Sequence, residues 1–211
     1  MEAMMPMKGM QIVLAVIGFA TLSAAAAHAQ TDVGLSFYKT FNSSTSGNGT
    51  VQSSPNSAGG MFELRHISKP LLGYEVTYSF NPADQSISPE VGSCGFFCSN
   101  PPVKIKGTAS EVALDWVVSA KYGSLRPFAV VGLGFFIAVP SSDEYMYDIN
   151  TIVRPTYVYG GGVDWSFHPR FGLRFQFRGN AYKAPDVSGL YFPTGTFMQT
   201  AEPMIGVFFR P

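Results

Sequence analysis

Hydrophobic and polar residues alternate with a period of two along most of the chain, most regularly between residues 157 and 182. A period of two is the side-chain period of a β-strand. A short segment, His168-Pro169-Arg170, divides this stretch into two arms. Each arm is about as long as a tilted membrane-spanning strand, roughly 9–11 residues. One face of each arm is aromatic and aliphatic, and the other carries charges and glycines, so the pattern predicts a transmembrane β-hairpin.

The same alternation predicts eight strands in the whole chain. We expect them at residues 32–41, 60–67, 72–80, 107–122, 128–139, 157–167, 171–182 and 197–210. Long polar segments follow every odd-numbered strand, at residues 42–57, 81–104, 140–156 and 184–195, and short turns follow the others. Outer-membrane barrels combine short periplasmic turns with longer extracellular loops and an even number of strands. The predicted fold is therefore all-β: an eight-stranded antiparallel up-and-down transmembrane β-barrel, with an interior that side chains fill.

Alternation alone does not say which face points outward. In a soluble barrel of this size, the apolar face points inward and can bind a ligand. Two features favour the membrane form: the apolar faces carry aromatic residues near their ends, and the glycines share the charged face, as a narrow lumen requires. A secreted soluble ligand-binding barrel remains the alternative.

Composition supports a membrane barrel and narrows the range of partners. Charged residues make up only 13% of the 211 residues, about half the usual share in a soluble domain, whereas aromatic residues reach 14%. Lys and Arg number 14, as do Asp and Glu, so the net charge gives no reason to expect a nucleic-acid partner. After the N-terminal region, no segment has the ~20 consecutive apolar residues of a transmembrane helix.

The first 29 residues have the organisation of a signal peptide. Lys8 precedes an apolar run, and an alanine-rich stretch ends in Ala27-His28-Ala29. A small-residue site of this kind indicates cleavage before Gln30. We therefore expect a signal peptide over 1–29 and a barrel domain over 30–211; an N-terminal membrane anchor is the alternative interpretation.

Three runs, at residues 73–78, 126–134 and 159–182, resemble the family of small bacterial outer-membrane β-barrels that includes the OmpA transmembrane domain and OmpW-type proteins. The resemblance covers nearly the whole chain after residue 29. It implies a bacterial outer-membrane location, contact with outer-membrane lipid, and folding by the outer-membrane assembly machinery. Such barrels end on an aromatic residue that the machinery recognises, whereas here Arg210 and Pro211 follow Phe209.

Charged residues on the predicted inner face can pair across a narrow lumen. An odd-length turn at residues 168–170 places Ser166 opposite Gly172 and Asp164 opposite Arg174. We expect a salt bridge between Asp164 and Arg174 that helps to close the pore. The predicted lumen charge network consists of Glu63, Arg65, Glu75, Glu111, Asp115, Lys121, Asp164, Arg174, Arg178 and Glu202.

Two cysteines, Cys94 and Cys98, lie close together in the second long loop. Disulfides form and persist in exported proteins, so a bond between these two is the first interpretation. Two thiols without a nearby histidine make a poor metal site. We expect no cofactor and no metal site in this chain.

His66 and Ser68 are the strongest enzymatic lead. The segment resembles the H-x-S element of outer-membrane lipid A deacylases, which are also eight-stranded barrels, and Glu75 could orient the imidazole. In that family, however, the element lies late in the chain, and His66 falls beside a predicted periplasmic turn, away from the outer leaflet that holds lipid A.

The sequence therefore predicts an outer-membrane barrel with a structural or surface-interaction role and no catalytic activity. An extracellular ligand would bind through the long loops. Three alternatives remain: passage or binding of small apolar molecules, a lipid A deacylase-like enzyme, and the soluble barrel.

Overall fold

The computed structural model describes residues 30–68, 71–89, 103–141, 151–185 and 194–211. The expected signal peptide and both cysteines, Cys94 and Cys98, lie outside the described residues. Within the described ranges, no helix is long and apolar enough to cross a membrane.

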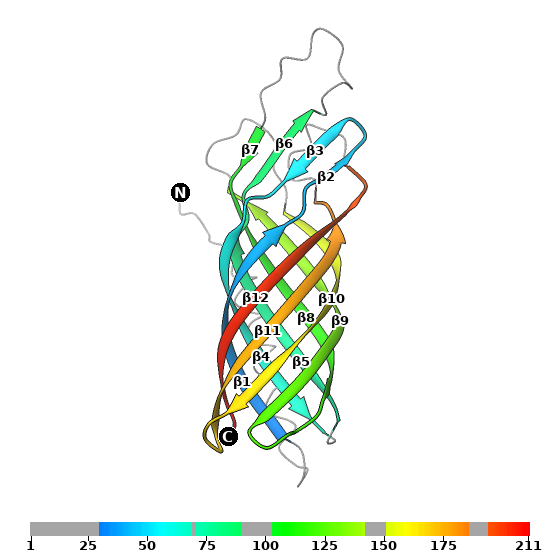
Figure 1. Ribbon diagram of the computed structural model, residues 1–211. Helices are drawn as coiled ribbons and strands as arrows, with labels where there is room; N and C mark the ends of the chain where they lie inside the picture. The colour runs from blue at the N-terminus through cyan, green and yellow to red at the C-terminus, as the bar shows by residue number, and fades with distance from the viewer. Residues whose placement is uncertain (1–29, 69–70, 90–102, 142–150, 186–193) are drawn as a thin grey trace, which may run out of the picture.

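Eight long strands form a closed antiparallel barrel (Figure 1). Each strand pairs with the long strands next to it in the chain, and β1 pairs with both β4 and β12, which closes the barrel. This arrangement confirms the predicted fold class. The strands are β1 (Gln30–Asn42), β4 (Ser57–Ile67), β5 (Leu72–Pro82), β8 (Gly107–Ser119), β9 (Leu125–Pro140), β10 (Ile152–Ser166), β11 (Phe171–Lys183) and β12 (Phe197–Phe209).

The main differences from the predicted strands lie at their ends. β10 begins at Ile152, five residues before the predicted start at 157, because its pairing with β9 continues up to Ala138. β8 instead ends at Ser119, before the predicted end at 122. The chain turns there through Gly123, whose φ of 61° is in the left-handed region that glycine adopts readily.

Apolar side chains cover the outside of the barrel. Leu133, Phe135 and Trp116 are 54%, 58% and 58% exposed, whereas alternate positions on the same strands are buried inside. Exposed aromatic residues also lie near both strand ends, for example Phe171 near one end and Tyr157 near the other. A water-soluble protein rarely exposes a contiguous apolar surface of this extent. Because the apolar face points outward, the soluble ligand-binding barrel is contradicted.

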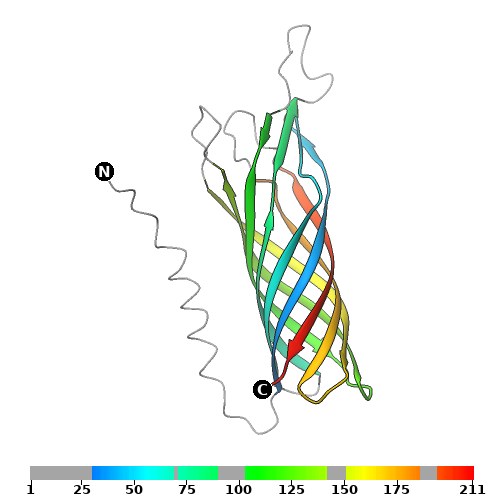
Figure 2. The same ribbon diagram turned by 90° about the vertical axis from the view of Figure 1, so that its left-hand side faces the viewer.

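A second, small sheet stands at the long-loop end of the barrel, opposite to the C-terminus (Figures 1 and 2). Its strands pair in the order β2-β3-β6-β7, and they are β2 (Thr45–Gly47), β3 (Thr50–Ser53), β6 (Gln85–Pro89) and β7 (Val103–Ile105). Apart from Ile105, these residues fall in the first two segments that we expected to be long loops, residues 42–57 and 81–104, so the expectation of loops without strands was wrong there. Ile87 and Ile105 pack with Ala138 of β9, which gives the sheet a small apolar core against the barrel wall.

Candidate functional site

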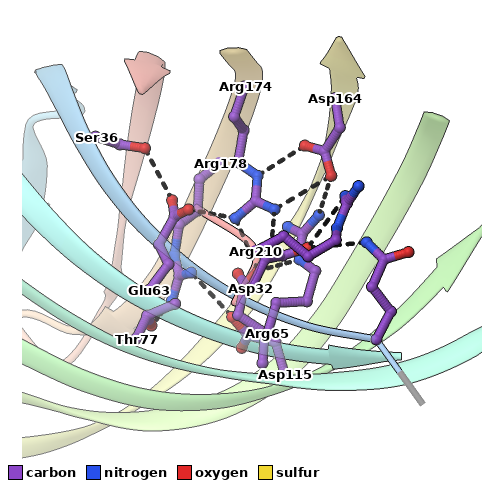
Figure 3. A network of polar contacts seen from close by, with 12 residues as sticks. Asp32, Ser36, Glu63, Arg65, Thr77, Asp115, Asp164, Arg174, Arg178 and Arg210 are labelled. Atoms are coloured by element: carbon purple, nitrogen blue, oxygen red, sulfur yellow. Dashed lines mark hydrogen bonds and ion pairs between the residues drawn. The ribbon is translucent and has the colours of Figure 1, made fainter. Parts of the chain in front are cut away.

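Arg174 lies at the centre of the charged interior (Figure 3). It pairs with Asp164 across the β10–β11 ladder, as the sequence predicts, and Ser166 pairs with Gly172. Its Nε donates to Asp164 Oδ1 at 2.8 Å, and its Nη2 donates to Asp32 Oδ1 at 3.1 Å. Its Nη1 donates to Glu63. One guanidinium therefore joins carboxylates from three other strands.

Arg65 extends this network across the lumen. Its Nε lies 2.5 Å from Glu75, and its Nη1 lies 3.2 Å from Asp164. Arg65 is on β4 and Asp164 is on β10, four strands away in a barrel of eight, so the pair connects opposite walls. The guanidinium also lies 4.0 Å from the centre of the Phe128 ring, an arrangement that favours a cation. We call this group the central network: Asp32, Glu63, Arg65, Glu75, Asp164 and Arg174.

Arg178 forms a second group nearer the long-loop end. Its Nη1 donates to Asp115 at 2.9 Å, and its Nη2 donates to Glu111 at 3.1 Å and to Thr77 at 3.0 Å. Arg178 is on β11, whereas both carboxylates are on β8, three strands away. This group therefore also crosses the lumen.

Of the predicted inner-face charges, one is misplaced. All of them except Lys121 are buried. Lys121 is exposed and lies in the turn after β8, so its assignment to the lumen was wrong. The alternating pattern continues past Ser119, but the backbone turns there and pairs Tyr122 with Leu125.

Small and aromatic residues shape the space around the charges. A Cβ atom at Gly34 would lie 2.7 Å from a Glu63 carboxylate oxygen, so that position accepts little more than glycine without a shift. The Phe208 ring lies 5.4 Å from the Arg174 guanidinium. Sequence analysis missed Asp32, Phe128 and Phe208 as members of this interior. Their even numbers place them in phase with the inward positions of their strands, which is the signal that would have identified them.

The residues of the predicted enzymatic site, His66 and Glu75, do not come together in the structure. His66 is half-buried and accepts or donates a hydrogen bond at 2.9 Å with Thr31, and its ring lies 5.1 Å from that of Tyr74. Glu75 points into the lumen and binds Arg65. His66 and Glu75 therefore lie on opposite faces of the barrel wall, and the carboxylate does not orient the imidazole.

Beyond Arg178, the lumen opens toward the long-loop end into a small recess that is open to solvent. Its walls include Glu111, Asn180 and Glu202 as well as the aromatic side chains of Phe136 and Tyr182. Among the described residues, no group of three or more histidines, cysteines or carboxylates is arranged to hold a metal ion.

Comparison with solved structures identifies the fold. The attachment invasion locus protein Ail of Yersinia pestis, in complex with sucrose octasulfate, aligns with a TM-score of 0.53 at 11% identity, over 87% of this chain and 99% of Ail. Neisserial surface protein A aligns with a TM-score of 0.55 at 10% identity, over 88% of this chain and 98% of its own. The outer-membrane protein OprG of Pseudomonas aeruginosa aligns with a TM-score of 0.53 at 9% identity, covering 86% and 96%.

These structures are small outer-membrane barrels, so the fold expected from the family resemblance is confirmed. No protein-family model matches the chain. A sequence comparison with curated proteins found no match. At such low identity, the likeness concerns the backbone fold alone.

Proposed function

We propose that this protein is a bacterial outer-membrane β-barrel that is closed to passage and has a structural or surface-interaction role, without catalytic activity. The outer-membrane assembly machinery would insert it, and its apolar outer surface would contact lipid. The fold and the exposed apolar belt support the membrane location.

The central network carries the proposal that the lumen is closed. Asp32, Glu63, Arg65, Glu75, Asp164 and Arg174 are at most 1% exposed, and their ion pairs connect opposite walls. A solute crossing the barrel would have to separate these buried pairs. Breaking one buried pair by removing a partner typically costs about 3–5 kcal/mol, so an opening through several is rare.

The long-loop end is where a surface role would operate. In outer-membrane barrels, long connections are extracellular and short turns are periplasmic. By this rule, the β2-β3-β6-β7 sheet and the recess face the outside. Two structural neighbours have names that point to the cell surface: an attachment invasion locus protein, solved with a heparin analogue, and a surface protein.

Conductance across planar bilayers tests the closed lumen. We expect the purified protein to give no steady single-channel current. A stable current from a correctly folded sample, as judged by its mobility shift on unheated gels, would contradict the closed barrel and favour passage of small molecules. The matched positive control is the double variant Arg65→Ala/Arg174→Ala, which removes both cations of the central network and should raise the conductance.

An epitope-accessibility experiment tests the orientation. A short tag inserted between Asn48 and Gly49 should bind antibody on intact cells. The same tag inserted after Gly123, in a short turn, should bind only after the outer membrane is permeabilised. The reverse pattern would place the small sheet in the periplasm and reject the surface role.

A further inference from the structure

Negative charge exceeds positive charge in the part of the lumen around Arg178, nearer the long-loop end. Three buried carboxylates, those of Glu111, Asp115 and Glu202, lie near a single buried cation, Arg178. Arg178 pairs directly with Glu202 across the β11–β12 ladder, but its guanidinium turns to Asp115 and Glu111 on the far side. Among the described residues, Glu202 forms no ion pair.

The described residues that hold Glu202 in place are neutral donors. Asn180 Nδ2 donates to its Oε1 at 3.1 Å, and Thr200 Oγ1 donates to the same atom at 3.4 Å. The side chain of Glu202 is 6% exposed, and that of Asn180 is 3% exposed. A buried carboxylate without a cation is costly, because the desolvation of its charge is not offset.

The side-chain oxygen of Asn180, beside Glu202, lacks a donor among the described residues. Asn180 Oδ1 is buried and has no hydrogen-bond partner in the part of the chain that the structure describes, although the amide nitrogen of the same side chain is satisfied. A buried acceptor without a partner typically costs about 1–3 kcal/mol. Asn180 and Glu202 both line the recess, so a carboxylate without an ion pair and an amide oxygen without a donor lie in the same wall.

The recess wall also has an apolar part beside its hydroxyl and amide side chains. The rings of Phe136 and Tyr182 stack at a centroid distance of 4.2 Å, and the Tyr182 hydroxyl lies 3.6 Å from the sulfur of Met198. All three residues line the recess together with Glu111 and Glu202. The recess therefore combines a polar wall that contains two carboxylates, those of Glu111 and Glu202, with an apolar wall.

We propose that this recess binds a small organic cation, a primary ammonium group on a short alkyl body. The ammonium carries three donors and a positive charge, which match the carboxylates and the free Asn180 oxygen. The alkyl body would contact Tyr182 and Met198. A metal ion suits the site less well, since Ca²⁺ takes six to eight oxygen ligands and the described residues offer no metal-binding group of three. This proposal rests on the proposed surface role, because it names the class of ligand that would bind at the long-loop end of the barrel.

Ligand-dependent thermal stability of the full protein in detergent tests this site. A ligand that binds the folded state raises the unfolding midpoint as its concentration increases. We expect 1,5-diaminopentane to raise the midpoint, whereas the uncharged 1,5-pentanediol, of similar length, should not. Glu202→Gln keeps the shape and the hydrogen-bond acceptor, so this variant should fold and should weaken diamine binding at least tenfold.

Asp84→Asn is the matched control, because Asp84 is an exposed carboxylate at the same end of the barrel and does not line the recess. This variant should keep the wild-type response. Three results would overturn the proposal: no midpoint shift in the wild type, an undiminished shift in Glu202→Gln, or an equal shift with MgCl₂ alone. The bilayer conductance of the same samples is a separate readout, so a failed cation site is distinguishable from a failed closed barrel.

Discussion

Asp164 and Arg174 face each other across the β10–β11 ladder and form an ion pair of 2.8 Å inside the barrel. The pair is not isolated, because Asp164 also accepts from Arg65 on the opposite wall, and Arg174 also binds Asp32 and Glu63. The register of the β10–β11 hairpin thus places both side chains where they can also contact residues of other strands across the lumen. The stability of the interior should depend on the whole network more than on any single pair.

Removing Arg174 should strongly destabilise the barrel. Arg174→Ala leaves the four carboxylates of the central network with Arg65 as the remaining cation of that network, and we expect a loss of about 3–5 kcal/mol in the free energy of unfolding. Unfolding by urea in lipid vesicles measures this loss of stability. Arg170→Ala is the control, since Arg170 is exposed in the neighbouring turn and should have little effect. Equal stability of both variants would show that the central network contributes little.

A double-mutant cycle on Asp164→Ala and Arg174→Ala should give a coupling energy of about 0.5–3 kcal/mol. The coupling should be smaller than the loss caused by either single variant, because each residue keeps other partners in the network. Unfolding of the wild type, both single variants and the double variant supplies the four values. A coupling energy of zero would reject a direct interaction between the two side chains.

Much of the barrel could be predicted because membrane strands repeat one simple pattern. The period of two fixed which residues face inward, and the odd-length turn fixed the Asp164–Arg174 pairing. The partners across the lumen could not be predicted, because Arg65 and Asp164 meet through closure of the barrel and lie 99 positions apart. The pairing of Asp32 with Arg174 could not be predicted for the same reason, since the two residues are 142 positions apart.

The small sheet was missed although a local signal was present. Asn48 and Gly49 have φ values of 53° and 74°, as the two central residues of a tight hairpin turn require, and an Asn-Gly pair is a strong hairpin signal. The flanking strands are only three and four residues long, so no alternation could develop. Lys121 was misplaced for the opposite reason: the alternating pattern continues to residue 122, whereas the strand β8 ends at Ser119.

A charge placed on the outer belt should be costly if lipid covers it. Leu133 is 54% exposed near the middle of β9, so Leu133→Arg should destabilise the barrel by about 2–4 kcal/mol in a bilayer. Ser124→Arg, in an exposed turn, should cost about 0–1 kcal/mol. Reversible unfolding from lipid vesicles measures both variants. A tolerated arginine at position 133 would contradict the assignment of this face to lipid.

The hairpin of β2 and β3 should be removable without loss of the barrel. Gly49 has a φ of 74°, which a β-branched residue adopts only with strain, so Gly49→Val should disrupt the turn between Gly47 and Thr50. Among the described strands, those of the barrel pair only with one another, so we expect the closed sheet not to depend on this turn. We expect faster hydrogen exchange in β2 and β3, unchanged protection in β11 and β12, and a retained mobility shift on unheated gels.

Gly49→Asn is the control, because asparagine tolerates positive φ and should preserve the hairpin. A loss of the mobility shift in Gly49→Val would instead show that the small sheet is required for the barrel to fold.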